Sequence, residues 1–589
     1  MTTHFRHAMP FGAELQPGGE TRFRLWAPDV AQVELELDSG ERVPMQAIGE
    51  GWHACRHRAP AGTGYRYRVR PDLLVPDPAS RLQAGGDVHG SSVVVDPVAY
   101  AWQHPEWRGR PWREAVVYEL HVGLFGGFNG VREALPRLRE LGVTAIELMP
   151  IAQFPGTRNW GYDGVLPYAP AAVYGTPDEL KALVDAAHGL GLMLILDVVY
   201  NHFGPDGNYL GQYASAFFRD DGPHTPWGAA INVGLQPVGD FFLHNALYWL
   251  QEYRFDGLRL DAVHAIGHPD WLSAFARHIR MAITDRQVHL VLENEANQAH
   301  LLGAGRFDAQ WNDDFHNALH VLLTGEQAGY YGAYADDPLG HLRRCLAEGF
   351  AWQGEAMRGK PRGEPSAGLS PLCFVDFLQN HDQVGNRAFG ERLTTLVDAP
   401  RVEAALALLL LTPAVPLLFM GEEWGSRTPF LFFTDYQQEA LRTAVREGRR
   451  KEFAEFSAFS GEAVPDPNDP ATFERSRPDP AEARSAQGQA RLAQVRQLLE
   501  LRHRHLVPHL EQTHALGART LGRAALRAHW QLGPQRLSVY SNLGTEDLAL
   551  VGDPPPAVNW LHGDPAAITA FIHGRLPAAT TLVFLEPAT

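Results

Sequence analysis

Cysteine is scarce in this chain, and the few residues present form no ligand or disulfide pattern. Only three occur among 589 residues, Cys55, Cys345 and Cys373, and they lie far apart. Disulfide frameworks use paired cysteines, and zinc sites use closely spaced ligands. We therefore expect reduced, mostly buried thiols, as in a cytoplasmic protein.

Positive charge is also in short supply. The chain carries 51 Lys and Arg against 68 Asp and Glu, which gives a formal net charge of −17. Binding to a phosphate backbone or to an anionic membrane surface requires the opposite sign, so we expect neither nucleic acid nor membrane as a partner. Neutral substrates are compatible with this charge.

A long uninterrupted apolar run is missing as well. The first residues contain no apolar signal core. Residues 402–420 are nearly all apolar and approach the length of a membrane span, but Pro413 and Pro416 interrupt them and Glu403 lies at their start. We instead predict a helix over 402–411, a turn, and a buried strand over 415–420.

Both ends of the chain contain short strand-like runs. Two-residue alternation occurs at residues 21–26, 33–37 and 65–69, with Gly and Pro between them, and predicts an N-terminal β-sandwich domain over residues 1–105. The chain is rich in strand-forming residues again at 526–530, 537–541 and 581–585, which predicts a small C-terminal β domain over residues 501–589.

Between these ends, over residues 106–500, strand-like runs alternate with helical ones. The eight predicted strands lie at residues 116–120, 144–149, 193–200, 255–261, 290–293, 307–311, 373–377 and 415–420. Eight such units predict an α/β fold of the (β/α)8 TIM-barrel type. A doubly wound sheet is the alternative, but it would need a Gly-rich phosphate turn after an early strand, and none is visible. The polar, Pro-rich stretch at 450–490 predicts a loop.

Polar side chains cluster at the ends of four predicted strands. They are Asp197 with Asn201 and His202, Arg259 with Asp261, Glu293 with Glu295, and residues 379–382. In a barrel, functional residues lie at the carboxyl ends of the strands. A single acid at a strand end is often only a helix cap, but four such clusters at the same end of the barrel indicate a functional site. Paired carboxylates from neighbouring strands are what glycosidic-bond cleavage needs.

These four segments resemble the signature regions of the α-amylase family of glycoside hydrolases. The matching residues are 197–202, 257–261, Glu293 and 380–382, and their order and spacing both agree. The resemblance implies that Asp261 is the nucleophile, Glu293 the general acid and base, and Asp382 the residue that holds the ring hydroxyls. It also implies that Arg259 keeps Asp261 ionised. A retaining mechanism needs the two carboxyl groups about 5 Å apart, and we expect that separation here.

The same resemblance extends to residues that bind the sugar. It implies that His202 and His381 hydrogen-bond the sugar in the cleavage subsite, that Asp197 orders the site, and that Tyr162 is a stacking platform. Many family members bind calcium near the position of Asn201, but the other oxygen ligands are not identifiable here. We therefore assign no metal and no cofactor.

Two glutamates compete for the role of the acid. Glu293 and Glu295 face the same side of an extended chain, so alternation alone does not separate them. The family pattern favours Glu293.

A narrower resemblance concerns the substrate. Residues 377–387, 429–435, 445–453 and 464–473 resemble the maltooligosyltrehalose trehalohydrolases of this family. The resemblance implies hydrolysis of the α-1,4 bond next to the terminal trehalose unit, with maltooligosyltrehalose and related α-glucans as ligands and maltooligosyltrehalose synthase as pathway partner. The alternatives are a glycogen branching enzyme, a general α-glucan hydrolase, and a glycan-binding scaffold on an inactive barrel.

Overall fold

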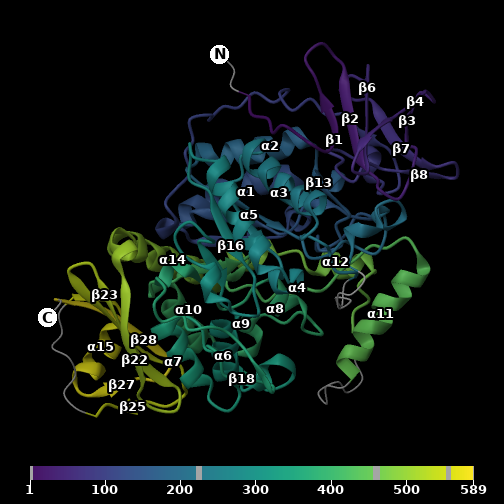
Figure 1. Cartoon of the computed structure of the whole chain (residues 1–589). Helices are drawn as coiled ribbons and strands as arrows, with labels where there is room; N and C mark the ends of the chain where they lie inside the picture. Colours follow the sequence, from purple (N-terminus) through teal and green to yellow (C-terminus); the bar gives the residue numbers. More distant parts are fainter. Residues whose placement is uncertain (1–3, 220–227, 455–463, 552–558, 588–589) are drawn as a thin grey trace.

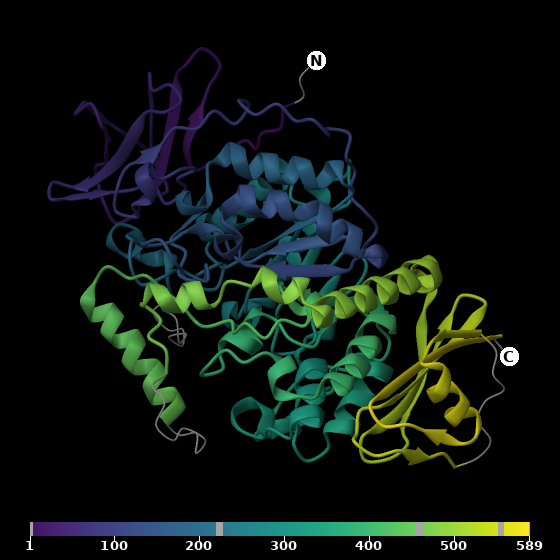
Figure 2. The same cartoon turned by 180° about the vertical axis from the view of Figure 1, so that it is seen from behind.

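The molecule consists of a central barrel with a β-rich region at each end. The computed structural model describes residues 4–219, 228–454, 464–551 and 559–587. The N-terminal strands, in purple, and the C-terminal strands, in yellow, lie at opposite ends in both views (Figures 1 and 2).

Eight parallel strands form a closed barrel, which confirms the prediction and rules out the doubly wound sheet. In order around the barrel they are β10 (Val117–Leu120), β11 (Ala145–Leu148), β14 (Met193–Val198), β15 (Gly257–Leu260), β16 (His289–Leu292), β17 (Ala309–Trp311), β20 (Phe374–Phe377) and β21 (Val415–Phe419). All eight predicted strands are present, with ends that differ by a few residues at most.

The barrel interior has an apolar layer and, above it, a polar one. The apolar layer includes Val117, Ala145 and Ile195, which pack together inside the barrel. Two residues further along the same strands, on the same side of the pleat, come Glu119, Glu147 and Asp197. The strand register therefore places a ring of charged groups at the carboxyl end, where barrel enzymes carry their chemistry.

Helices surround the barrel, and their ends follow local signals. The principal ones are α1 (Gly127–Leu141), α2 (Pro177–Gly189), α3 (Gln236–Gln251), α5 (Pro269–Ala282), α6 (Asp313–Thr324), α7 (Pro338–Glu348), α10 (Ala399–Leu411) and α14 (Ala486–Leu501). Helix α2 begins at a capping box in which Thr176 and Glu179 each accept from the other's backbone N–H. The apolar run at 402–420 forms most of α10 and then β21. Within the described ranges, none of the helices combines the length and apolarity of a membrane span.

The N-terminal region consists of two antiparallel sheets, as the sequence predicts. One contains β1 (Gly12–Leu15), β2 (Thr21–Trp26), β6 (Trp52–His57) and β5 (Gln46–Gly49). The other contains β4 (Arg42–Pro44), β3 (Glu34–Leu37), β7 (Gly64–Arg70), β8 (Leu73–Val75) and β9 (Ser92–Val93). Phe23 of one sheet packs edge-on against Tyr65 of the other at 4.9 Å between ring centroids. The two sheets therefore share a core, as a sandwich requires.

The C-terminal region contains a five-stranded antiparallel sheet. Its strands are β22 (His514–Thr520), β23 (Ala525–Leu532), β24 (Gln535–Asn542), β28 (Thr580–Pro587) and β26 (Asn559–His562). Helix α10 of the barrel anchors this sheet, because Thr581 donates to the Ala404 carbonyl at 2.8 Å and Arg401 donates to the Leu543 carbonyl at 2.8 Å. The domain boundaries 1–105, 106–500 and 501–589 stay predictions.

The loop predicted at 450–490 is wrong for most of its described length. It contains the end of α11 (Glu439–Ala454), then α12 (Pro470–Arg475), α13 (Pro480–Arg484) and the start of α14. Asp469 and Asp479 cap the two short helices, and a proline follows each at the first helical position. Proline is favoured there because its missing N–H would have no helical partner. Two of the prolines that suggested a loop, Pro470 and Pro480, are therefore helix starts.

Candidate active site

Arg259 lies at the centre of the polar layer. It is fully buried on β15, beside β14, and its Nη1 lies 2.7 Å from Asp197 Oδ2 and 2.9 Å from Asp261 Oδ1. Its Nη2 lies 2.8 Å from Glu293 Oε2. The guanidinium stacks over Trp311 at 4.0 Å from the ring centroid. One cation thus fixes three carboxyl groups from three neighbouring strands.

The two central carboxyls have pKa values displaced in opposite directions. Burial raises the pKa of Glu293, and the Asp261 charge adds to this rise against the opposing pull of Arg259. Burial acts the same way on Asp261, but Arg259, His202 and the amide of Asn201 together lower the pKa of Asp261 below its ordinary value. The two pKa values are therefore displaced in the directions that a nucleophile and a general acid need.

Backbone geometry brings these two groups together. Asn201 donates from Nδ2 to Asp261 Oδ2 at 2.9 Å, and the Ala262 N–H donates to Glu293 Oε2 at 2.9 Å. Ala262 adopts the left-handed region with φ of 39°, which is uncommon for a residue with a Cβ. A hydrogen bond also links the Asp261 and Glu293 carboxyl groups. The separation of about 5 Å stays a prediction.

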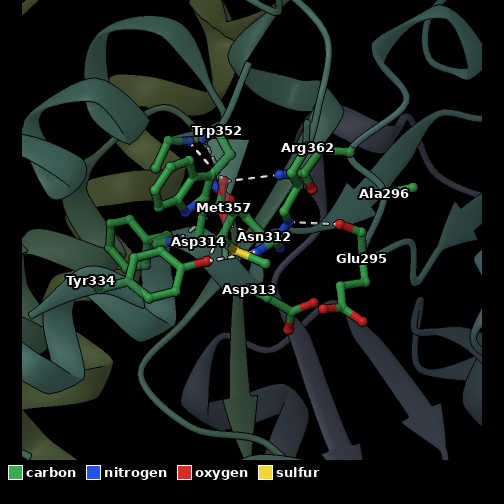
Figure 3. A network of polar contacts seen from close by, with 12 residues as sticks. Glu295, Ala296, Asn312, Asp313, Asp314, Tyr334, Trp352, Met357 and Arg362 are labelled. Carbon is green, nitrogen blue, oxygen red and sulfur yellow. Dashed lines mark hydrogen bonds and ion pairs between the residues drawn. The ribbon is translucent and has the colours of Figure 1, made fainter. Parts of the chain in front are cut away.

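Glu295 has a different environment from Glu293. Its side chain is 62% exposed, and its carboxyl group lies 3.8 Å from His264 Nε2. Its carbonyl accepts from Arg362 Nε at 2.8 Å, which ties its backbone to a second network (Figure 3). Only Glu293 contacts Arg259 among these two glutamates. The structure thus supports the choice of Glu293 on grounds that alternation could not supply.

Asp382 lies in the first turn of α8 (His381–Gly385), just after β20. The helix begins there because Asn380 accepts from the Gln383 N–H as its cap. Burial and the charge of Glu293 raise the pKa of Asp382, and His381 opposes the rise. Asp382 and Glu293 therefore interact electrostatically, and Arg259 acts on both of them as well as on Asp261.

Glu119 was missed in the sequence. It lies at the end of β10, hydrogen-bonds His381 Nδ1, and accepts from the His381 backbone N–H at 3.0 Å. Burial lowers the pKa of His381, but Glu119 outweighs it, so the pKa of His381 lies above its ordinary value. The signal was a carboxylate inside an apolar strand, in the same pattern as Asp197 on β14.

The other predicted sugar-binding residues contact the charged groups around Arg259 or one another. Tyr162 donates to Asp197 Oδ2 at 2.6 Å, and its ring stacks on His381 with 5.0 Å between centroids. His202 hydrogen-bonds the Tyr162 carbonyl at 2.9 Å and Asn201 Oδ1 at 2.5 Å. One face of Tyr162 is therefore already occupied by His381, and its role as a sugar platform stays a prediction.

Asp313 is a further carboxyl that the sequence did not single out. It follows β17 at the start of α6, and burial together with the charge of Glu293 raises its pKa well above the ordinary value. Behind it, Asp314 lies 3.2 Å from Arg362 Nη2 and accepts from Tyr334 at 2.5 Å (Figure 3). The signal was weak, because the acids follow a strand too short to show a clear pattern.

No metal ligand set can be assigned. Among the residues that the structure describes, no group of three or more His, Cys, Asp and Glu side chains is arranged to hold an ion. The amide of Asn201, the position suggested by calcium-binding relatives, instead bonds Asp261.

The closed barrel and the paired carboxyls define a glycoside hydrolase of the α-amylase family, and the family model "Alpha amylase, catalytic domain" matches residues 89–224. The malto-oligosyltrehalose trehalohydrolase of Deinococcus radiodurans is 40% identical over 92% of this chain and 94% of its own. That of Saccharolobus solfataricus is 41% identical over 80% of this chain and 83% of its own. The chain belongs to the malto-oligosyltrehalose trehalohydrolase family.

A solved structure agrees with the fold over almost the whole length. The crystal structure of a putative α-amylase from Salmonella typhimurium is 45% identical, with a TM-score of 0.92 over 98% of this chain and 100% of that one. Both β-rich ends are therefore part of the shared architecture.

Proposed function

We propose that the protein hydrolyses the α-1,4-glucosidic bond next to the terminal trehalose unit of maltooligosyltrehalose and releases trehalose. The observation that carries the chemistry is the contact of Arg259 with Asp261 and Glu293, whose pKa values are displaced in opposite directions. The names of the relatives support the choice of substrate.

The first step breaks the glycosidic bond. Asp261 attacks the anomeric carbon while Glu293 donates its proton to the glycosidic oxygen, so trehalose leaves as a neutral alcohol. The product is a glycosyl ester on Asp261, and Glu293 is now a carboxylate. Arg259 lies within hydrogen-bond distance of both groups, so it stabilises the negative charge on Asp261 before this step and on Glu293 after it.

The second step restores the enzyme. Glu293 takes a proton from water, the resulting oxygen nucleophile attacks the anomeric carbon, and the ester bond to Asp261 breaks. The maltooligosaccharide leaves with its original anomeric configuration. Glu293 is then protonated again, and Asp261 is again a carboxylate.

The remaining residues shape the sugar subsite. We assign Asp382 to the ring hydroxyls and to the distorted sugar, and His381 and His202 to hydrogen bonds with the same ring. Glu119 keeps His381 as a donor, which supports this assignment. Asp197 holds Tyr162 and Arg259 in place.

The experiment compares two substrates of equal length. Purified protein is incubated with maltotriosyltrehalose and with maltopentaose, and products are separated by anion-exchange chromatography. We expect trehalose from the first at a rate far above cleavage of the second, and no cleavage of either by Asp261→Asn. Comparable rates would indicate a general α-glucan hydrolase, and new α-1,6 branches on amylose would indicate a branching enzyme. Binding without cleavage would indicate a scaffold.

The substrate also implies a preceding reaction. A maltooligosaccharide gains a terminal trehalose only if its reducing-end linkage is rearranged, so we propose maltooligosyltrehalose synthase as pathway partner. The three unpaired cysteines support a cytoplasmic location. A coupled assay tests the partnership: trehalose should appear from maltopentaose only when both proteins are present.

A further inference from the structure

We propose that Arg449, on helix α11, is a positioning residue that holds Asp382 in place through Asn386. The inference rests on the proposed function, because it concerns one of its three acids. Helix α11 follows the last barrel strand and lies outside the ring of barrel helices (Figure 1). Its segment resembled the family in the sequence, yet nothing in the mechanism so far uses it.

Asn386 supplies the contact to the acid. Its Nδ2 donates to Asp382 Oδ1 at 2.6 Å, and its backbone N–H donates to the Asp382 carbonyl at 3.0 Å. An asparagine amide can rotate by half a turn and then present its oxygen instead of its NH2 group. The carboxylate therefore keeps a donor only while something holds the amide in this orientation.

Arg449 holds the amide from the other side. Its Nη1 donates to Asn386 Oδ1 at 3.4 Å, and its Nη2 donates to the Gly385 carbonyl at 3.1 Å. The planar guanidinium thus reaches two adjacent residues of one turn at once, which an ammonium group does not reproduce. Because Arg449 can only donate, it selects the amide oxygen and leaves the NH2 group for Asp382.

Packing fixes the guanidinium. The Arg449 side chain is 12% exposed and lies over the rings of Phe432 at 5.1 Å and Phe453 at 4.7 Å. Glu452, one turn along α11, pairs with Nη1 at 3.0 Å. Stacked and ion-paired, the side chain has little freedom to leave Asn386.

The turn that receives Arg449 is itself closely packed. A Cβ at Gly385 would lie 2.0 Å from Trp160 Cζ2, so the helix end can approach the indole only as glycine. Trp160 in turn meets Phe432 edge-on at 5.0 Å and His381 at 5.5 Å. Because this packing leaves no free space, a shift of Arg449 would also displace Trp160 and His381.

The charge of Arg449 acts on Asp382 as well. The two interact electrostatically, and a nearby cation favours the ionised carboxylate. The other titratable or charged groups around Asp382 are His381, Glu293, Arg259, Glu119, Asp313 and Tyr330. Loss of the Arg449 charge should raise the pKa of Asp382, so activity should begin to fall at a higher pH as the solution is acidified.

The test combines Arg449→Gln, Arg449→Lys and Asn386→Ala with the control Arg450→Gln. Arg450 is the next basic residue, its side chain is 52% exposed, and it pairs with Glu447 at 3.4 Å on its own helix. We expect Arg449→Gln to lower kcat about tenfold with KM changed less than about twofold. The acid limb of the pH–rate profile should move upward, and Arg449→Lys should restore the limb but not kcat.

A double-mutant cycle separates positioning from folding. If Arg449 acts through Asn386, its replacement should cost little more once Asn386→Ala is present. Additive losses, or an equal loss in Arg450→Gln, would overturn the proposal. If thermal unfolding shows Arg449→Gln to be unstable, Arg449→Lys and Asn386→Ala carry the same comparison.

The substrate comparison keeps this inference separate from the proposed function. An Arg449 effect of equal size on maltotriosyltrehalose and on maltopentaose would support positioning even in a general α-glucan hydrolase. An enzyme that prefers the trehalose end but tolerates Arg449→Gln would overturn the positioning inference alone.

Discussion

The guanidinium of Arg259 contacts three carboxyl groups, and the position of each group around it affects the pKa of that group. Asp197 and Asp261 share Nη1, whereas Glu293 meets Nη2 and also accepts from the Ala262 N–H. Burial raises the pKa of Asp197 to about 7 despite Arg259. Several negative charges around one cation cannot all be stable in a buried site, so the pKa values of Asp197 and Glu293 are raised while that of Asp261 is lowered.

The first residue prediction separates the two glutamates. Glu293→Gln removes the proton donor and should lower kcat by at least about 100-fold, whereas Glu295→Gln should change it by less than about tenfold, because the Glu295 side chain points to solvent. Activity on maltotriosyltrehalose with each variant measures this. Full activity of Glu293→Gln together with a dead Glu295→Gln would reverse the assignment.

The second residue prediction concerns pH. Glu119 raises the pKa of His381, so its removal should lower that pKa. If protonated His381 binds the sugar, Glu119→Gln should move the alkaline limb of the pH–rate profile toward lower pH. Because Glu119 also raises the pKa of Asp382, the acid limb should move toward lower pH in the same variant. An unchanged alkaline limb would remove His381 from the titrating groups of the site.

Candidate site residues that follow a recognisable strand were predicted from the sequence. Residues that reach the site only through contacts with distant parts of the chain were not. Asp261, Glu293 and Asp382 each follow a recognisable strand. Glu119 and Asp313 acquire their roles through partners far along the chain, since Glu119 meets His381 across 262 residues. No local pattern records such a contact.

At the scale of elements, buried parallel strands were the most predictable feature. Their runs of Val, Ile and Leu are continuous because both faces are covered, and each run ends near a polar residue. The helices at 470–475 and 480–484 were not predicted, because proline is common both in turns and at the first position of a helix. In each helix the Asp before the proline is the N-cap, but Asp466 precedes Pro467 in a turn, so the dipeptide alone does not identify a helix start.

The capping box of α2 gives a test at this scale. Thr176→Ala removes the acceptor for the Glu179 N–H and should lower the free energy of unfolding by about 1 kcal/mol. Urea denaturation followed by circular dichroism measures the change. The exposed Thr545→Ala is the matched control and should stay within about 0.5 kcal/mol of the parent. Equal values for both variants would show that the box contributes nothing.

At the scale of the whole molecule, buried acids tie stability to pH. Burial raises the pKa of Asp77 in the N-terminal region to about 6, that of Asp376 in the barrel to about 7, and that of Glu422 to about 8. The folded state keeps protons that the unfolded chain releases at lower pH. Each group therefore makes the fold less stable as pH rises from about 4 toward its folded pKa.

Asp376→Asn tests this relation. The folded pKa of about 7 against an ordinary 3.8 predicts a loss on the order of 4 kcal/mol across that window. The variant lacks the titration, so its unfolding free energy should fall less steeply between pH 4 and pH 7. Urea denaturation at a series of pH values measures both slopes. The control Asp72→Asn, whose parent side chain is 87% exposed, should keep the slope of the parent protein. If Asp376→Asn also kept that slope, the Asp376 carboxyl would already be ionised in the folded protein.

The position of α11 after the eighth strand has an evolutionary consequence. Helix α11 lies in the stretch between β21 and α14, and α14 is the helix that packs against α1 and α10 beside the barrel. A deletion or tilt in this intervening segment would leave the packing of the barrel helices intact while it altered the support beneath one acid. Selection could therefore tune turnover through an appendage, at little risk to the fold that carries it.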